Sequence, residues 1–268
     1  MDEMGAAGEA RVQRLVVFDY DWSLIDCNSD EAVLDLHPSL HQEMRKLRRE
    51  GMQWTQLVDH MLTMLADLGV ARSDILSHIA AVPVQDGMLE AVRLAHSLPN
   101  TRLAIVSDAN HAFISAMLQR HCLEEVFSDV YTNEARWEAY AVAGTTTRGE
   151  RLRVSAYHKG PPHDCPLCPV NMCKGSIMQQ LVAKYRPEQV VYIGDGGGDF
   201  CPCARLTAAD VILARASAEE AAEGRSFPLL GKLIRLADEN KLAARLRPWQ
   251  TGHDVYEGVR DVFLVNDS

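Results

Sequence analysis

The sequence predicts an α/β protein whose core is a doubly wound, Rossmann-like parallel sheet. Apolar runs of strand length alternate with longer amphipathic segments, which is the pattern of strands connected by helices. Three of the runs end abruptly in acidic or hydroxyl residues, and such sheets bind their ligands at the carboxyl ends of the strands. These runs cover residues 14–20, 101–106 and 189–193. We therefore expect the polar residues that end them to form one site.

The first run ends in two carboxylates, Asp19 and Asp21. Side chains alternate across a strand, so these two can face the same side with one residue between them. A pair this close can share a divalent cation. One carboxylate can then attack phosphorus while the other transfers a proton to the leaving group. Asp-x-Asp also occurs by chance in loops, so the pair alone favours catalysis only weakly.

Residues 30–81 have helical character, with apolar side chains recurring three and four positions apart. This spacing predicts an insert of two or three helices, followed by another amphipathic helix over residues 84–98. Within the insert, Trp54 and Met61 either line a pocket or fill the core of the insert itself.

The second run is followed by Ser107-Asp108-Ala109-Asn110 and then by a predicted helix over residues 112–121. Ser107 therefore lies between a strand end and a helix N-terminus, a position that binds anions. The alternative is that Ser107 simply caps the helix.

Residues 129–132 and 152–157 are predicted strands, and the Gly- and Thr-rich turn at residues 143–147 favours a hairpin. A cysteine-rich segment follows, in which four residues have the side chains of a structural Zn²⁺ site. They are His163, Cys165, Cys168 and Cys173, with a further pair at Cys201 and Cys203. Reduced thiols or occasional disulfides are the alternative.

The third strand, residues 189–193, follows a helix predicted over residues 175–185 and ends in a glycine-rich segment that contains Asp195 and Asp199. A shorter strand is expected at residues 209–213. The remainder is predicted to be helical, over residues 229–240 and 253–263.

The bulk composition excludes several classes of protein. The 268 residues carry a net charge of −10 without a long basic run, which argues against a nucleic-acid partner. No apolar run approaches membrane-spanning length, and the N-terminus lacks the pattern of a secretory signal. Seven unevenly spaced cysteines indicate a reducing compartment, so we expect a cytoplasmic protein. No pattern indicates an oligomeric state.

The chain resembles the haloacid-dehalogenase-type phosphatases in four motifs that occur in the same order. They are Asp19-Tyr-Asp21, Ser107, Lys174, and Asp195 with Asp199. Within them, three segments resemble the phosphoethanolamine/phosphocholine phosphatase family. They are Asp26-Cys-Asn-Ser-Asp30, Ser107-Asp-Ala-Asn110 and Asn171-Met-Cys-Lys-Gly175. That family has relatives acting on pyridoxal phosphate, thiamine monophosphate and pyrophosphate. The resemblance thus implies hydrolysis of a small phosphorylated metabolite.

The resemblance also implies a role for each matching residue. Asp19 would be the nucleophile that forms an aspartyl phosphate, and Asp21 the general acid and base. Ser107 and Lys174 would hold the phosphoryl oxygens. Mg²⁺ would be bound by the carboxylates of Asp19 and Asp195 and by the backbone carbonyl of Asp21. Asp199 would be either a further ligand or an acceptor that orients Lys174. The substrate's cationic amine would face Asp30, Asp108 and Asn110, although helix capping would equally explain acidic residues there.

The same resemblance implies a catalytic core of residues 1–28 and 84–268, with residues 29–83 inserted as a small helical cap. Trp22 and Gly198 depart from the family pattern. We expect the first to reshape the mouth of the pocket and the second to weaken metal binding. The alternatives are a zinc- or redox-responsive binding protein without turnover, or an enzyme for pyrophosphate, phosphoserine or nucleotides.

Overall fold

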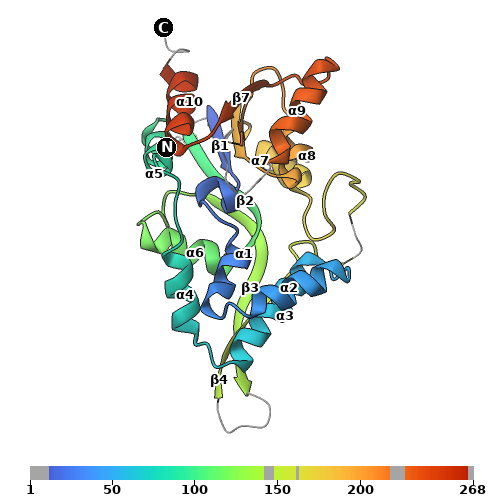
Figure 1. Ribbon diagram of the computed structural model, residues 1–268. Coiled ribbons are helices and arrows are strands. Elements are labelled where there is room, and N and C mark those ends of the chain that lie inside the picture. Colours follow the sequence, from blue (N-terminus) through green and yellow to red (C-terminus); the bar gives the residue numbers. More distant parts are fainter. Residues whose placement is uncertain (1–11, 142–147, 161–162, 218–226, 265–268) are drawn as a thin grey trace, which may run out of the picture.

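The computed structural model describes residues 12–141, 148–160, 163–217 and 227–264, and seven strands within them form one sheet (Figure 1). The strand order is β4-β3-β2-β1-β5-β6-β7, and every neighbouring pair is parallel except the hairpin of β3 and β4. The strands are β1 (Arg14–Phe18), β2 (Thr101–Asn110), β3 (Asp129–Ala141), β4 (Arg148–Ser155), β5 (Gln189–Gly194), β6 (Val211–Arg215) and β7 (Arg245–Trp249).

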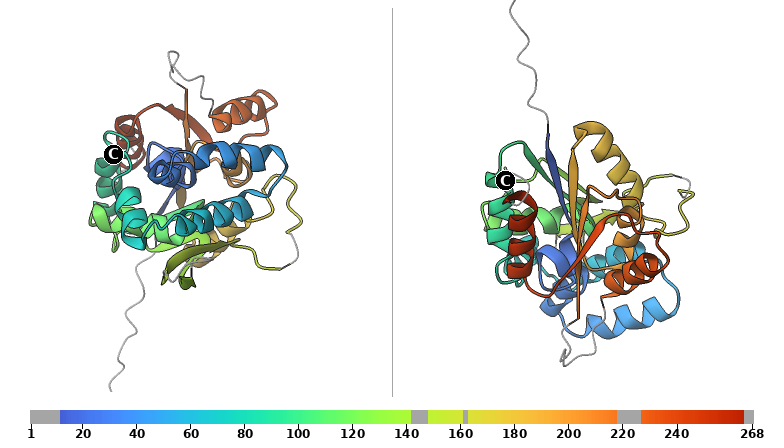
Figure 2. Two further views of the ribbon diagram at one scale, coloured as in Figure 1. Left: turned by 60° about the horizontal axis from the view of Figure 1, so that its bottom comes forward. Right: turned by 90° about the horizontal axis from the view of Figure 1, so that it is seen from above.

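Helices cover both faces of the sheet, as the right-hand view of Figure 2 shows. The alternating side chains of β1 divide between two cores, with Val16 and Phe18 in one and Leu15 and Val17 in the other. The first core is closed by α5 (Met88–Ser97), α6 (His111–Arg120) and α10 (Gly252–Leu264), and the second by α7 (Lys174–Tyr185), α8 (Phe200–Cys203) and α9 (Pro228–Asp238). The predicted doubly wound α/β fold is confirmed.

Several strands differ from the expected ones. β1 ends at Phe18 rather than at residue 20, and β6 covers Val211–Arg215 rather than residues 209–213. β2 continues through Asn110, so Ser107 lies inside a strand rather than in a loop. The hairpin is present, but β3 and β4 are longer than predicted, and its expected turn at residues 143–147 lies outside the described residues. The pattern of β7, Arg-Leu-Arg-Pro-Trp, was not recognised as a strand because an edge strand tolerates charged residues and proline.

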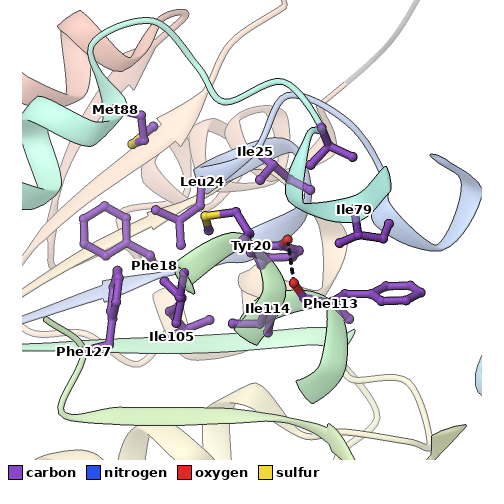
Figure 3. Close-up of a cluster of buried hydrophobic side chains, with 14 of the residues drawn as sticks. Phe18, Tyr20, Leu24, Ile25, Ile79, Met88, Ile105, Phe113, Ile114 and Phe127 are labelled. Atoms are coloured by element: carbon purple, nitrogen blue, oxygen red, sulfur yellow. Dashed lines mark hydrogen bonds between the residues drawn. The ribbon is translucent and has the colours of Figure 1, made fainter. Parts of the chain in front are cut away.

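Immediately after β1 the chain makes a tight turn at Tyr20–Leu24. The side chain of Tyr20 is fully buried in the first core, where its hydroxyl donates to the carbonyl of Phe113 at 3.4 Å (Figure 3). Phe18 occupies the same core and meets Phe127 edge to face. Burial of these aromatic rings anchors the backbone on either side of Asp19.

Between the turn and α5, the insert contains four α-helices rather than the expected two or three: α1 (Ser29–Ala32), α2 (Leu40–Arg49), α3 (Trp54–Asp67) and α4 (Arg72–Ala80). The β3–β4 hairpin packs against α3, where the Arg153 guanidinium pairs with both oxygens of the Asp59 carboxylate. Met61 lies in the core and is not exposed to a pocket. Among the described helices, none combines the length and apolar character needed to cross a bilayer.

Candidate active site

The register of the three central strands brings the predicted site residues together. Phe18 of β1 pairs with Ile105 of β2 and with Ile193 of β5. Ser107 and Asp195 each come two residues after those partners, so they flank the chain where Asp19 and Tyr20 leave the sheet. The Asp19 N–H donates to the Ile193 carbonyl at 2.9 Å, which fixes this junction.

Asp19 is buried, and its Oδ1 lies 2.9 Å from the Nζ of Lys174. The same oxygen accepts the N–H of Tyr20 at 2.7 Å. Burial raises the pKa of Asp19 to about 7, and the charge of Asp199 adds to this, against the opposing effect of the Lys174 ammonium. Carboxylate oxygens of Asp195 and Asp199 lie within 4.8 Å of one on Asp19, and such a group of acids favours binding of a cation.

Lys174 is the first residue of α7, and its ammonium joins two carboxylates, those of Asp19 and Asp199. Burial alone would lower the pKa of Lys174, but the charges of Asp19 and Asp199 raise it well above its usual range. The side chain therefore stays protonated.

Asp199 is fully buried, and its carboxylate is held by four donors. Oδ1 accepts from Lys174 Nζ and from the hydroxyl of Tyr192, both at 2.7 Å. Oδ2 accepts the N–H groups of Asp195 and Gly196 at 3.2 and 3.0 Å. The close packing requires glycine at position 194, where a Cβ would lie 2.7 Å from Oδ2. Sequence reasoning missed Tyr192, which lies within an apolar strand.

Asp21 lies in the turn that follows β1, and its Oδ1 accepts the N–H of Ser29 at 2.9 Å. Burial, and after it the charge of Asp30, raises the pKa of Asp21 well above its usual range. The next residue of the same turn, Trp22, has a left-handed backbone with φ of 57°. This conformation costs a residue other than glycine about 1 kcal/mol, so neighbouring contacts must hold it in place.

Arg215, the last residue of β6, supplies these contacts and was not identified from the sequence. Its guanidinium donates to the Trp22 carbonyl and to Asp26 Oδ1, both at 2.7 Å, although 193 positions separate Arg215 from Trp22. It also stacks on the ring of Phe227 at 4.3 Å. One signal was available, because an arginine ends an otherwise apolar strand at the same edge of the sheet as Asp195.

Replacing Arg215 with Met is expected to lower kcat by about tenfold, because the backbone beside Asp21 loses the two hydrogen bonds that Arg215 donates, to the Trp22 carbonyl and to Asp26. Steady-state kinetics will measure the change. Arg247→Met is the matched control, since Arg247 lies on the neighbouring strand in a half-exposed pair with Asp261. An unchanged kcat in the Arg215 variant would show that the turn is held without it.

The acidic residues proposed to face a cationic amine do not cap helices. Asn28 caps α1 by accepting the N–H of Glu31, and Asn110 caps α6 by accepting the N–H of Phe113. Asp30 is instead buried in the first turn of α1, where its Oδ2 accepts the indole N–H of Trp54 at 3.0 Å and its Oδ1 has no hydrogen-bond partner. Burial raises the pKa of Asp30 to about 7, and the charge of Asp108 adds to this.

A cavity of about 380 Å³ lies over the carboxylate pair. The described residues that line it are largely acidic or aromatic, and Trp54 is one of them while Met61 is not. They are Asp19, Asp21, Trp22, Asn28, Glu31, Arg48, Met52, Trp54, Asp108, Asp195 and Gly196.

One of the zinc ligands predicted in the cysteine-rich segment is wrong. Cys165, Cys168 and Cys173 do lie together, but their fourth neighbour is Cys201. His163 is outside the group because both ring nitrogens have backbone partners, the Pro169 carbonyl at 2.8 Å and the Cys165 N–H at 3.3 Å.

A buried carboxylate, a lysine ion-paired to it and two further acids meet at the carboxyl edge of a doubly wound sheet. This fold and this site define a phosphatase of the haloacid dehalogenase type. The chain belongs to the family described as "Putative Phosphatase", which matches residues 14–262. It is thus a phosphoric monoester hydrolase, as the resemblance implied.

The names of similar proteins describe different activities. The "Thiamine phosphate phosphatase-like protein" of Arabidopsis thaliana is 36% identical over 75% of this chain and 80% of its own length. "Inorganic pyrophosphatase 2" of the same plant is 31% identical over 90% of this chain and 80% of its own length. The structure titled "Phospho-Aspartyl Intermediate Analogue of Phosphoserine phosphatase" shares the fold, with a TM-score of 0.54 and 14% identity over 88% of this chain and 94% of its own.

Proposed function

We propose that this phosphatase hydrolyses small phosphomonoesters whose leaving group carries a positive charge. The observation behind this proposal is the charge of the cavity. Five acidic residues line it, and Arg48 is the one basic side chain among the described residues of its wall. Arg48 is itself engaged, since it stacks on Trp54 at 4.9 Å and lies 3.7 Å from Glu31. A second phosphate would meet repulsion there, whereas an ammonium or thiazolium would be attracted.

In the proposed reaction, a carboxylate oxygen of Asp19 attacks phosphorus as the bond from phosphorus to the leaving oxygen breaks, which produces an aspartyl phosphate. Lys174 lies close enough to Asp19 to bind a phosphoryl oxygen while it offsets the charge of the nucleophile. Ser107, buried on the neighbouring strand, is the second proposed phosphate ligand. Water then hydrolyses the aspartyl phosphate and releases inorganic phosphate.

Asp21 is proposed to give the leaving oxygen its proton and afterwards to take one from the attacking water. The raised pKa favours this role, because a carboxyl must be protonated near neutral pH before it can act as an acid. Asp19 and Asp21 both line the cavity, so a substrate there can contact both.

The donor set suits Mg²⁺, which prefers hard oxygen ligands. Carboxylate oxygens of Asp19, Asp195 and Asp199 lie within 4.8 Å of one another, and all three residues are buried. Because four donors already saturate Asp199, we assign Mg²⁺ to Asp19, Asp195 and the backbone carbonyl of Asp21, and give Asp199 the role of orienting Lys174. Bound Mg²⁺ would screen the repulsion between phosphate and nucleophile. Weaker metal binding caused by Gly198 stays a prediction.

Residues 29–83 are proposed to act as a cap over this cavity, with the core formed by residues 1–28 and 84–268. The chain enters and leaves this segment at one place, since the Asp26 N–H donates to the Pro83 carbonyl at 2.7 Å and Ile25 bridges Val84. Trp54, Met52 and Arg48 of the segment line the cavity. Movement at this junction would admit the substrate and then exclude water.

Comparing kcat/KM across phosphorylated metabolites tests the proposal. We expect phosphoethanolamine, phosphocholine and thiamine monophosphate to exceed pyridoxal phosphate and pyrophosphate by at least about tenfold, which corresponds to one charge interaction of about 1.4 kcal/mol. A preference for pyrophosphate or pyridoxal phosphate would contradict the proposed substrate class, although not the phosphatase reaction.

Asp108→Asn should lower kcat/KM for the cationic substrates by about tenfold, because the side chain lines the cavity and the amide keeps its size but loses the charge. Hydrolysis of p-nitrophenyl phosphate, which lacks a cation, should be unchanged. The matched control is Asp35→Asn, at an exposed position outside the cavity. An equal loss on every substrate would show that Asp108 supports the structure of the site rather than selecting the substrate.

A further inference from the structure

Four cysteines from two separate segments meet beside the active site. The sulfur atoms of Cys165, Cys168, Cys173 and Cys201 all lie within 4.8 Å of one another, and those of Cys165 and Cys201 are 3.5 Å apart. In a tetrahedral zinc–thiolate site the metal–sulfur distance is about 2.3 Å, so neighbouring sulfurs are about 3.8 Å apart. The four side chains therefore match the dimensions of one metal centre.

Positive groups lie beside the cluster and would offset the charge of thiolates bound to a metal. Cys173 directly precedes α7, so the positive end of this twelve-residue helix lies at the sulfurs. The guanidinium of Arg205 lies 4.0 Å from the sulfur of Cys165. Cys201 packs so tightly on the first turn of α7 that a Cβ on Gly175 would lie 2.5 Å from its sulfur.

We propose that Cys165, Cys168, Cys173 and Cys201 bind one structural zinc ion. Thiolates are soft ligands that select zinc over magnesium, and four protein ligands leave no open position for catalysis. The assignment rests on the geometry of this chain alone. It differs from the set expected from the sequence because Cys201 of α8 takes the place of His163.

The zinc ion would order the part of the chain that carries two active-site residues. Residues 156–173 contain no helix or strand in their described part, and ordering such a segment costs considerable entropy. A shared ion ties this segment to α8. Lys174 immediately follows Cys173, and Asp199 lies two residues before Cys201, so the zinc site would set the spacing of the Lys174–Asp199 pair.

Metal analysis of the full-length protein, purified without chelators or added zinc, tests this proposal directly. We expect one zinc per chain by plasma mass spectrometry, and replacement by cobalt should give the intense visible absorption of tetrahedral cobalt thiolates. The double variant Cys165→Ser/Cys168→Ser should lose the zinc. Cys122→Ser, which removes an exposed cysteine outside the cluster, should retain it.

Asp195→Asn distinguishes this site from the carboxylate site, because it alters a proposed magnesium ligand and should leave the zinc content unchanged. Loss of zinc in that variant would place the ion at the carboxylates and overturn the proposal. Absence of zinc from the wild-type protein, iron in its place, or a Cys165–Cys201 disulfide found in non-reduced peptides would overturn it too. The cobalt spectrum is measured on the wild-type chain, so the test stands even if the double variant fails to fold.

Discussion

Asp19→Asn is expected to abolish phosphomonoester hydrolysis, with kcat falling by about 10⁴-fold or more. The amide has the shape of the carboxylate but is not nucleophilic, so no aspartyl phosphate can form. Steady-state assays with p-nitrophenyl phosphate measure the loss independently of the natural substrate. Acid quenching during turnover of a ³²P-labelled substrate should trap labelled wild-type protein and leave the variant unlabelled.

The fold of the Asp19 variant should be intact. The substitution removes one buried negative charge from beside Asp199 and Asp195, so thermal unfolding should occur at or above the wild-type temperature. Asp35→Asn, at an exposed site, is the control for a general effect of replacing aspartate. Full activity in the Asp19 variant would exclude this residue as the nucleophile and leave the site without an assigned mechanism.

Lys174→Met carries the second-largest expected effect, because it removes the cation shared by two buried carboxylates, Asp19 and Asp199. We expect kcat to fall by about 10²- to 10³-fold, the usual loss when one donor to a developing charge is removed. The free energy of unfolding should fall by about 3–5 kcal/mol, because breaking a buried ion pair leaves unpaired charge. Denaturant unfolding without magnesium measures the second quantity.

Lys184→Met is the matched control for Lys174, since both residues lie on α7. Lys184 pairs with Asp129 at 2.6 Å, but its side chain is 48% exposed. Solvent screens such a pair, and its loss should cost less than about 1 kcal/mol without affecting kcat. Equal destabilisation by the two variants would mean that the Lys174 pair is no stronger than a surface ion pair.

The sequence was sufficient wherever a signal is local. An apolar strand that ends in Asp19 and Asp21 is recognisable because strand length, apolar character and side-chain alternation are properties of neighbouring residues. The same reasoning predicted the β3–β4 hairpin and the helices between residues 29 and 83. Local spacing did not resolve which residue caps a helix. Asp30 and Asp108 each lie two positions from the true caps, Asn28 and Asn110, and only the backbone geometry distinguishes them.

The chain by itself thus determined the doubly wound sheet, the family and the carboxylates at the strand ends. The tertiary structure decided which distant side chains reach those carboxylates. It brought Arg215 to Trp22, Tyr192 to Asp199 and Cys201, in place of His163, to the other cysteines. The physical reason is that hydrogen bonds, ion pairs and thiolate clusters depend on separation in space. Residues far apart in a sequence carry no pattern that reveals it until the strands are placed side by side.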